Sequence, residues 1–229
     1  MTNKKCGRLL IAAGALVLCA AVSLVAYNRY TDKKAGEAAE KTAAVIREHI
    51  EAQTGQQNTD SGADSRSQDE SAETEAEELI PLDIDGELYI GLLEIPKLDL
   101  ELPITKGWDY NKMHHALCQY SGDVRHSDLI ICGHNYTSYL IDLDQLAVGD
   151  EIIFTEVNGR QHSYTVGWFE LLGGLEGEKL DAGSDDWDLT VFTCTWSGYS
   201  RVVVRCQACT PGARRTALPL ADYYSFVVK

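Results

Sequence analysis

The segment LTVFTCTWSGYSRVVVRC, residues 189–206, decides the fold of this chain. Residues 189–192 and 202–204 form short apolar runs of the length and composition typical of strands, so we predict a β-hairpin. A hairpin explains the apolar runs but leaves two residues unexplained. Cys194 ends the first predicted strand and Arg201 begins the second. The rest of the chain must indicate whether this thiol and this cation act together.

Similar short apolar runs, separated by turn residues, recur from residue 80 onward. Asn158-Gly159 is a strong tight-turn signal and predicts a second hairpin. We predict strands at residues 87–95, 98–104, 127–134, 149–157, 161–172, 187–194 and 201–208. We predict short helices at residues 109–120 and 138–146. Seven or eight strands with few helices indicate a mostly antiparallel barrel or sandwich.

An uncharged apolar run occupies residues 9–27, near the N-terminus. As a helix, these 19 residues would span about 29 Å, close to the thickness of a bilayer core. The basic residues Lys4, Lys5 and Arg8 precede the run and favour a cytoplasmic N-terminus. A cleaved signal peptide is the alternative, but the run is longer than usual and no Ala-x-Ala site follows it. We therefore expect a retained single-pass membrane anchor.

The sequence divides into three parts: a membrane anchor at residues 1–30, a helical stalk and acidic linker at 31–79, and a folded domain at 80–229. Residues 32–53 are rich in Ala, Glu and Lys and place Ala43, Ile46 and Ile50 at helical spacing. Residues 55–78 contain almost no large apolar side chain, so we expect them to be disordered.

Charge and cysteine content limit the function classes. The net charge of −15 disfavours a nucleic-acid partner, which needs a basic surface. Among seven cysteines, Cys206 and Cys209 form a single CxxC, but no second CxxC or HxxxH completes a zinc site. We expect no metal site and no cofactor. A redox role for the CxxC fits poorly, because no helix follows it.

Three residues at predicted strand ends could perform acyl transfer together. Cys194 could act as nucleophile, since a thiolate activated by a base attacks carbonyl groups. His134 follows Gly133 at the end of a predicted strand and could act as general base and acid. Arg201 could stabilise an oxyanion. The alternative is that these residues are structural, because buried cysteines are commonly inert.

A phosphotyrosine-phosphatase loop is a second alternative for Cys194 and Arg201. Such loops place five residues between cysteine and arginine, whereas six lie between them here. Both flanks are predicted strands, so the helix N-terminus that would bind phosphate is missing. The sequence therefore disfavours phosphate ester chemistry.

Several motifs together resemble the sortase family. TVFTC at 190–194 resembles the family's Thr-Leu-x-Thr-Cys strand end, and RVVV at 201–204 resembles its arginine followed by an apolar strand. IICGHN at 130–135 resembles its strand ending in Gly-His. GLLEIPKLDLELPI at 91–104 and DQLAVGDEIIF at 144–154 resemble two further family stretches. The matches follow the family's order over roughly residues 86–207.

The resemblance implies a mostly β fold, a closed eight-stranded barrel with short helices, preceded by a transmembrane helix. It implies a single-pass cysteine transpeptidase with its catalytic domain outside a Gram-positive-type cell. Such enzymes cut a sorting motif similar to Leu-Pro-x-Thr-Gly in secreted proteins and transfer the acyl group to an amine of a peptidoglycan precursor or a pilin lysine. The subclass stays open between class B and the short-loop classes.

The resemblance also assigns roles to individual residues. Cys194 corresponds to the nucleophile, His134 to the general acid and base, and Arg201 to the residue that stabilises substrate and oxyanion. Three neighbours are candidate substrate-binding residues: Thr193, Asn135 and Trp196. We expect His114 and His115 to face solvent, and Arg205 to be structural. A cysteine peptidase and an inactive membrane-tethered binding module remain the alternatives.

Overall fold

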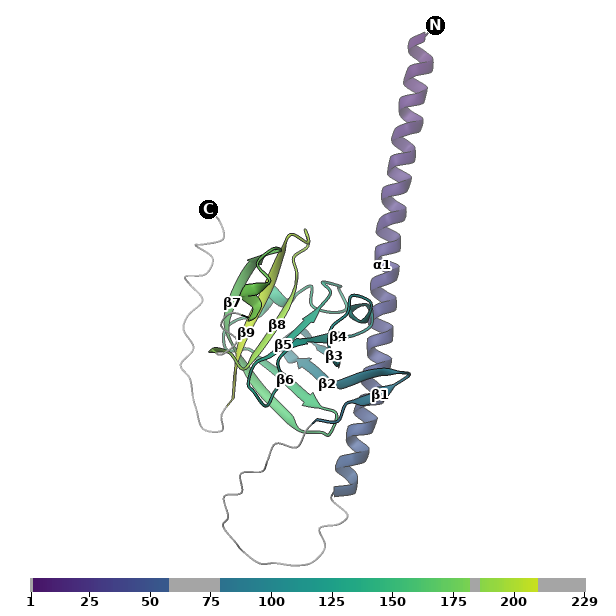
Figure 1. The fold of residues 1–229 in the computed structure, drawn as a ribbon. Coiled ribbons are helices and arrows are strands. Elements are labelled where there is room, and N and C mark those ends of the chain that lie inside the picture. The colour runs from purple at the N-terminus through teal and green to yellow at the C-terminus, as the bar shows by residue number, and fades with distance from the viewer. Residues whose placement is uncertain (1, 58–78, 182–185, 210–229) are drawn as a thin grey trace, which may run out of the picture.

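The computed structural model describes residues 2–57, 79–181 and 186–209, which form a β-barrel beside one long helix (Figure 1). The helices are α1 (Thr2–Gln57) and α2 (Glu178–Asp181). Three 3-10 helices are η1 (Pro96–Leu98), η2 (Lys112–His114) and η3 (Leu143–Gln145). The strands are β1 (Leu82–Ile84), β2 (Glu87–Ile95), β3 (Leu100–Thr105), β4 (Leu117–Ser121), β5 (Leu129–Gly133), β6 (Glu151–Glu156), β7 (Gln161–Gly173), β8 (Leu189–Cys194) and β9 (Ser200–Ala208).

Strands β2 to β9 close into an eight-stranded barrel, as the resemblance predicts. The strand order is β1-β2-β3-β4-β5-β8-β9-β7-β6, and pairing of β2 with β6 closes the ring. Strand β1 is a ninth strand that pairs with the first residues of β2, outside the ring. The pairs β3–β4 and β5–β8 are parallel and the other pairs are antiparallel. Both predicted hairpins are present as β6–β7 and β8–β9.

Alternation along the strands gives the barrel two apolar faces. Along β8, Leu189 and Val191 point into the barrel, while Phe192 belongs to a second apolar cluster on the outer face. The barrel interior is filled by aliphatic and aromatic side chains from all sides, including Ile104, Leu129, Ile131 and Phe154. Side chains therefore change face at every residue, as the pleat of a strand requires.

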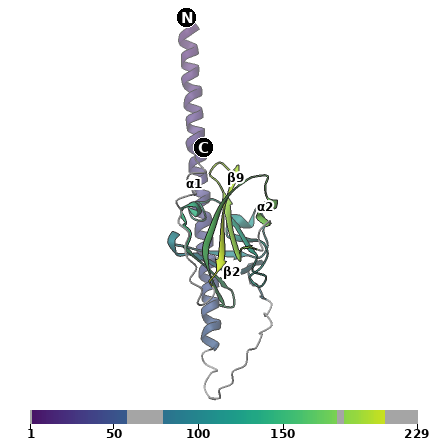
Figure 2. The same cartoon turned by 90° about the vertical axis from the view of Figure 1, so that its left-hand side faces the viewer.

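Helix α1 packs along the barrel with its C-terminal half. Ala35, Ala39, Ala43 and Ile46 form a buried stripe at helical spacing. The segment predicted as a stalk therefore packs along the side of the barrel, and it is not a spacer between the barrel and the apolar segment. The apolar residues 9–27 remain exposed and extend beyond one end of the barrel in both views (Figure 1, Figure 2). The acidic stretch at 58–78, predicted to be disordered, lies outside the described residues.

Two predicted helices are wrong in large part. Residues 109–120 contain only the turn η2, and the segment then becomes β4, because Leu117 and Cys118 pair with β3 and Cys118 also pairs with Cys132 of β5. Residues 138–146 contain only η3 and turns. Here the amides of Tyr139 and Ile141 both donate to the carbonyl of Tyr136, so the chain turns and does not propagate a helix. Tertiary pairing overrides local propensity in both segments.

Candidate active site

His134, Cys194 and Arg201 lie on the same outer face of the barrel because of strand alternation. Residues two positions away along each strand, Cys132, Phe192 and Val203, all belong to the outer apolar cluster. A side chain two residues further along a strand points to the same face. The pleat of β5, β8 and β9 therefore directs the three predicted residues to one side.

The hairpin β8–β9 brings the thiol and the guanidinium together. Cys194 and Arg201 are the last paired residues of this antiparallel register, directly opposite each other. The turn between them is closed by hydrogen bonds from the Thr195 amide to the Ser200 carbonyl and from the Gly198 amide to the Thr195 carbonyl. The register of the hairpin therefore makes the Cys194 thiol and the Arg201 guanidinium cross-strand neighbours.

Strands β5 and β8 run in parallel and place His134 beside Cys194. Gly133 is registered with Thr193, so the next residue on each strand is His134 and Cys194. The Thr193 hydroxyl donates to the Gly133 carbonyl at 2.9 Å and ties the two strand ends together. A Cβ at Gly133 would lie 2.4 Å from Leu117 Cδ2, so a larger residue before the histidine would force the buried Leu117 side chain to shift.

Aromatic rings surround the imidazole of His134. The ring centroids of Tyr136, His114 and Tyr110 lie 4.8, 4.9 and 5.2 Å from that of His134, and Tyr110 meets it edge-on. Burial, together with the charge that His114 can carry, lowers the pKa of His134 to about 4. His134 Nε2 is buried and has no hydrogen-bond partner among the described residues. The imidazole is therefore neutral at neutral pH and has a ring nitrogen available for a proton.

The guanidinium of Arg201 is lightly held. Its Nη1 donates to the carbonyls of Gly198 and Ser200, both at 3.4 Å, within its own hairpin turn. Among the described residues, no carboxylate lies within ion-pair distance of it. Its donors are therefore available to a ligand carbonyl or oxyanion.

The three residues line one cavity of about 370 Å³. Two segments that the sequence did not mark as functional build its other walls. One carries Trp108, Tyr110 and Met113 before β4, and the other follows β7 through Gly173, Gly174, Glu176 and Leu180 of α2. A Cβ at Gly174 would lie 2.9 Å from the Tyr199 carbonyl oxygen, so a glycine lets this wall approach the hairpin turn.

The candidate substrate-binding residues occupy three different environments. Thr193 is buried, and its hydroxyl is already used between the strands. The Asn135 amide donates to the Thr195 carbonyl at 3.1 Å, so it links the histidine strand end to the cysteine turn. Trp196 is 88% exposed and does not line the cavity.

His114 was predicted wrongly as solvent-facing. It is part-buried beside His134, and its Nδ1 lies 2.8 Å from the Tyr136 hydroxyl. The error follows from the wrong helix at 109–120, which gave no reason for the segment to turn back over β5. The signal that could have found it is the cluster of ring side chains at residues 108–115 upstream of a strand.

Two further features concern cysteines and metal ligands. Cys132 also lines the cavity, but its hydrogen bond with Cys118 and its burial raise the pKa of its thiol, which makes it a poor nucleophile.

Asp123, His126 and Asp128 form the one described group that could hold a metal ion. Asp123 accepts from the backbone amides of Arg125 and His126, and Asp128 accepts from that of Asp123, so both carboxylates stabilise a turn.

Comparison with known proteins adds independent evidence. The family model described as Sortase domain matches residues 93–209. Among solved structures, a Clostridium perfringens sortase D5 transpeptidase is 18% identical, with a TM-score of 0.53, and covers 76% of this chain and 99% of its own. Sortase C from Clostridium perfringens SM101 is 23% identical, with a TM-score of 0.44, and covers 53% of this chain and 70% of its own. Sortase C from Streptococcus pneumoniae is 19% identical, with a TM-score of 0.45, and covers 58% and 72%.

No curated protein sequence matches the chain. The family match spans just over half of the 229 residues and contains all three strand-end residues of the cavity. The chain therefore belongs to the sortase family, a family of cysteine transpeptidases.

Proposed function

We propose that this chain is a membrane-anchored sortase that uses Cys194 as nucleophile, His134 as general base and acid, and Arg201 as the donor to the oxyanion. The observation that carries the proposal is that three strand ends bring these groups into one cavity. A neutral imidazole beside a thiol can accept its proton as the thiol attacks a carbonyl.

The proposed reaction has two halves. The Cys194 sulfur attacks the carbonyl carbon of the scissile peptide bond while its proton passes to His134, and Arg201 donates hydrogen bonds to the resulting oxyanion. The C–N bond then breaks, and the imidazolium returns the proton to the leaving amine. This leaves a thioester on Cys194. An acceptor amine attacks the thioester carbonyl carbon and gives a proton to His134. The C–S bond breaks as the new amide bond forms, and the imidazolium returns the proton to the Cys194 sulfur.

The proposed substrates are secreted proteins with a C-terminal sorting motif similar to Leu-Pro-x-Thr-Gly. The proposed acceptors are an amine of a peptidoglycan precursor or a pilin lysine, at the cell wall of a Gram-positive-type cell. The family membership supports sorting-motif substrates and amine acceptors in general.

Helix α1 supports the membrane-anchored form of the proposal. It contains a segment long and apolar enough to cross a membrane, and these residues are exposed along their length. We propose that the N-terminus lies in the cytoplasm and the barrel outside, because basic residues precede the apolar run. Protease treatment of intact cells should cut the barrel, and protection of the barrel would contradict this orientation.

A ligation assay tests the chemistry. Full-length protein in detergent is mixed with a library of Leu-Pro-x-Thr-Gly-like peptides and an amine, and products are read by mass spectrometry. We expect ligated product from the wild type and from Cys132→Ala, which removes the other thiol of the cavity, and none from Cys194→Ala. Transfer that survives in Cys194→Ala would contradict the assignment.

Two further outcomes identify the alternatives. Hydrolysis that depends on Cys194, without ligation, would indicate a cysteine peptidase. Absence of any product, together with Cys194 alkylation that is as slow as that of a model thiol and unchanged in His134→Gln, would indicate an inactive binding module.

A further inference from the structure

The active-site end of the barrel is fixed to α1 just below its apolar segment. Asp32 of α1 accepts hydrogen bonds from the backbone amides of Thr137 and Ser138, at 3.1 and 3.2 Å, and from the Ser138 hydroxyl at 2.7 Å. Thr137 and Ser138 follow His134 by three and four residues. We call these hydrogen bonds the Asp32 clamp. The clamp joins the loop that follows the catalytic histidine directly to the helix.

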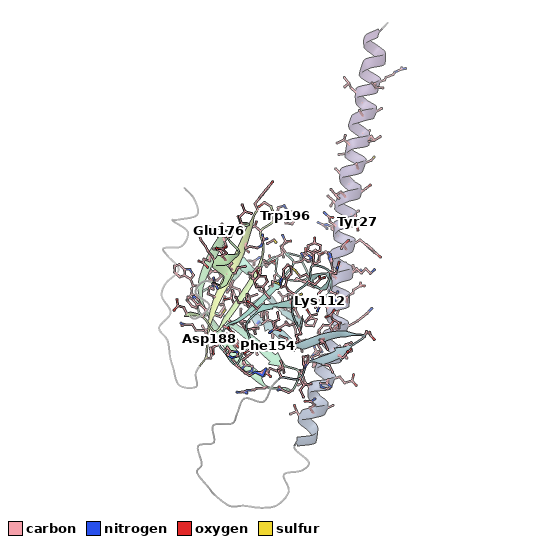
Figure 3. All side chains as sticks on the ribbon, viewed as in Figure 1. Tyr27, Lys112, Phe154, Glu176, Asp188 and Trp196 are labelled. Atoms are coloured by element: carbon pink, nitrogen blue, oxygen red, sulfur yellow. The ribbon has the colours of Figure 1, made fainter. Side chains whose placement is uncertain are left out.

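The geometry of α1 sets how far this end lies from the apolar segment. Tyr27 is the last residue of the uncharged run, and Asp32 comes five residues later in the same continuous helix. Five residues of α-helix rise about 7.5 Å. Figure 3 shows Trp196, at the tip of the β8–β9 turn, at the same level along the helix as Tyr27.

Large apolar side chains project from this end of the barrel without cover. Trp196, Tyr199 and Leu175 are 88%, 84% and 101% exposed. They come from two segments that touch, because the Gly174 amide donates to the Tyr199 carbonyl. We call these three residues the rim. Packing against the described part of the chain does not explain the rim, since none of the three side chains is buried there.

We propose that the rim inserts into the interfacial layer of the membrane that α1 crosses, so that the active-site cavity opens beside the lipid headgroups. This rests on the membrane anchoring proposed above. Tryptophan and tyrosine favour the headgroup level of a bilayer, where an apolar ring can be buried while its polar edge stays hydrated. Tyr27 ends the apolar run of α1, Tyr30 follows it by three residues, and both side chains are exposed.

A bilayer fits the rim better than a protein partner does. The continuous helix and the Asp32 clamp hold the rim at the level where the membrane must begin, so contact follows from geometry. Glu176, which follows Leu175 in the sequence, is paired with Lys179, so this carboxylate beside the rim is compensated.

Depth-dependent quenching of tryptophan tests the inference on the full chain. The protein is reconstituted into vesicles of phosphatidylcholine and phosphatidylglycerol, with or without lipids that carry a quencher near the headgroup. Trp196 is one of four tryptophans, so the wild type should lose a component of its emission that Trp196→Ser does not lose. Trp168→Phe is the matched control, because Trp168 is 53% exposed in the middle of β7, and this variant should lose the same quenched component as the wild type.

A spacer variant separates the rim from the membrane without changing the barrel. Seven helix-forming residues inserted between Arg29 and Tyr30 add nearly two full turns and lift the barrel by about 10 Å. We expect the Trp196 component of quenching to disappear in this variant. Quenching that persists at full strength would overturn the inference.

The outcomes distinguish the two proposals. Release of the chain from vesicles by an alkaline wash would overturn the anchoring, and the rim inference with it. Retention of the chain with equal quenching of wild type and Trp196→Ser would overturn the rim inference alone. Ligation activity in detergent depends on neither result.

Discussion

Strand β9 carries two arginines on the same face of the barrel, and they have opposite environments. Arg205 is 2% exposed and donates to the carbonyls of Leu180 and Lys179, the hydroxyl of Thr190 and the carboxylate of Glu170, at 2.9 to 3.2 Å. Arg201, four residues earlier, has only the two 3.4 Å contacts within its own turn and lines the cavity.

The segment between β7 and β8 creates this difference. Its helix α2 covers Arg205 and supplies two backbone acceptors to it, while Gly173 and Gly174 leave Arg201 open to the cavity. Residue type and strand face are the same for both arginines. What decides between a structural and a functional arginine is therefore whether a neighbouring segment already satisfies the donors of the guanidinium.

The largest expected effect separates the two arginines by activity. Arg201→Ala should lower kcat/KM for transfer by roughly 10²–10³-fold, because a donor to the oxyanion is lost. Arg205→Met should keep the wild-type kcat/KM per folded molecule, since Arg205 does not reach the cavity. Ligation kinetics, normalised to active-site titration, measure both variants. Equal losses of kcat/KM in Arg201→Ala and Arg205→Met would mean that Arg201 has no special role in the reaction.

Stability should show the opposite order. Arg205→Met removes the guanidinium that donates hydrogen bonds to two carbonyls, a hydroxyl and a carboxylate. We expect this change to lower the free energy of unfolding by roughly 3 kcal/mol. Arg201→Met should change the free energy of unfolding by less than about 0.5 kcal/mol, because no well-made bond is lost. Urea unfolding of both variants measures this difference. A stable Arg205→Met would mean that the buried arginine is replaceable by apolar volume.

The sequence alone selected the three strand-end residues that line the cavity beside Arg201's turn. Strand-end positions and motif resemblance selected His134, Cys194 and Arg201, and the structure brings all three into one cavity. These residues could be selected because each stands at the end of a short apolar run, a local pattern that is visible in sequence without knowledge of strand pairing.

The remaining walls of the cavity could not be read from sequence. His114, Tyr110 and Gly174 lie in segments without periodicity, where the path of the chain depends on tertiary pairing. Residues 109–120 have a helix-like composition, yet β3 and β5 take part of this segment into the sheet. Packing of α1 on the barrel was likewise not predicted, although its stripe of small residues has helical spacing.

A smaller effect concerns the pH dependence of stability. It arises at His134, which lines the cavity, and not at Arg205, which is buried under α2. Burial lowers the pKa of His134 from its ordinary 6.5 to about 4 in the folded chain. Between these values the unfolded chain binds a proton that the folded chain excludes, so this contribution to stability falls as the pH is lowered from 6.5 to 4 and is constant above 6.5. Because the His134 ring is only part-buried, solvent screening reduces the effect, and we expect a loss of about 1 kcal/mol.

His134→Gln isolates this contribution, because the carboxylates of the chain titrate equally in both proteins. As the pH is lowered from 7.5 to 4, the free energy of unfolding should fall more steeply for the wild type than for His134→Gln. Above pH 6.5 the two curves should have the same slope. His114→Gln should flatten the wild-type slope in part, since the charge on His114 is the second cause of the shift. Parallel curves for wild type and His134→Gln would mean that the imidazole binds its proton with an ordinary pKa and that burial does not disfavour its charged form.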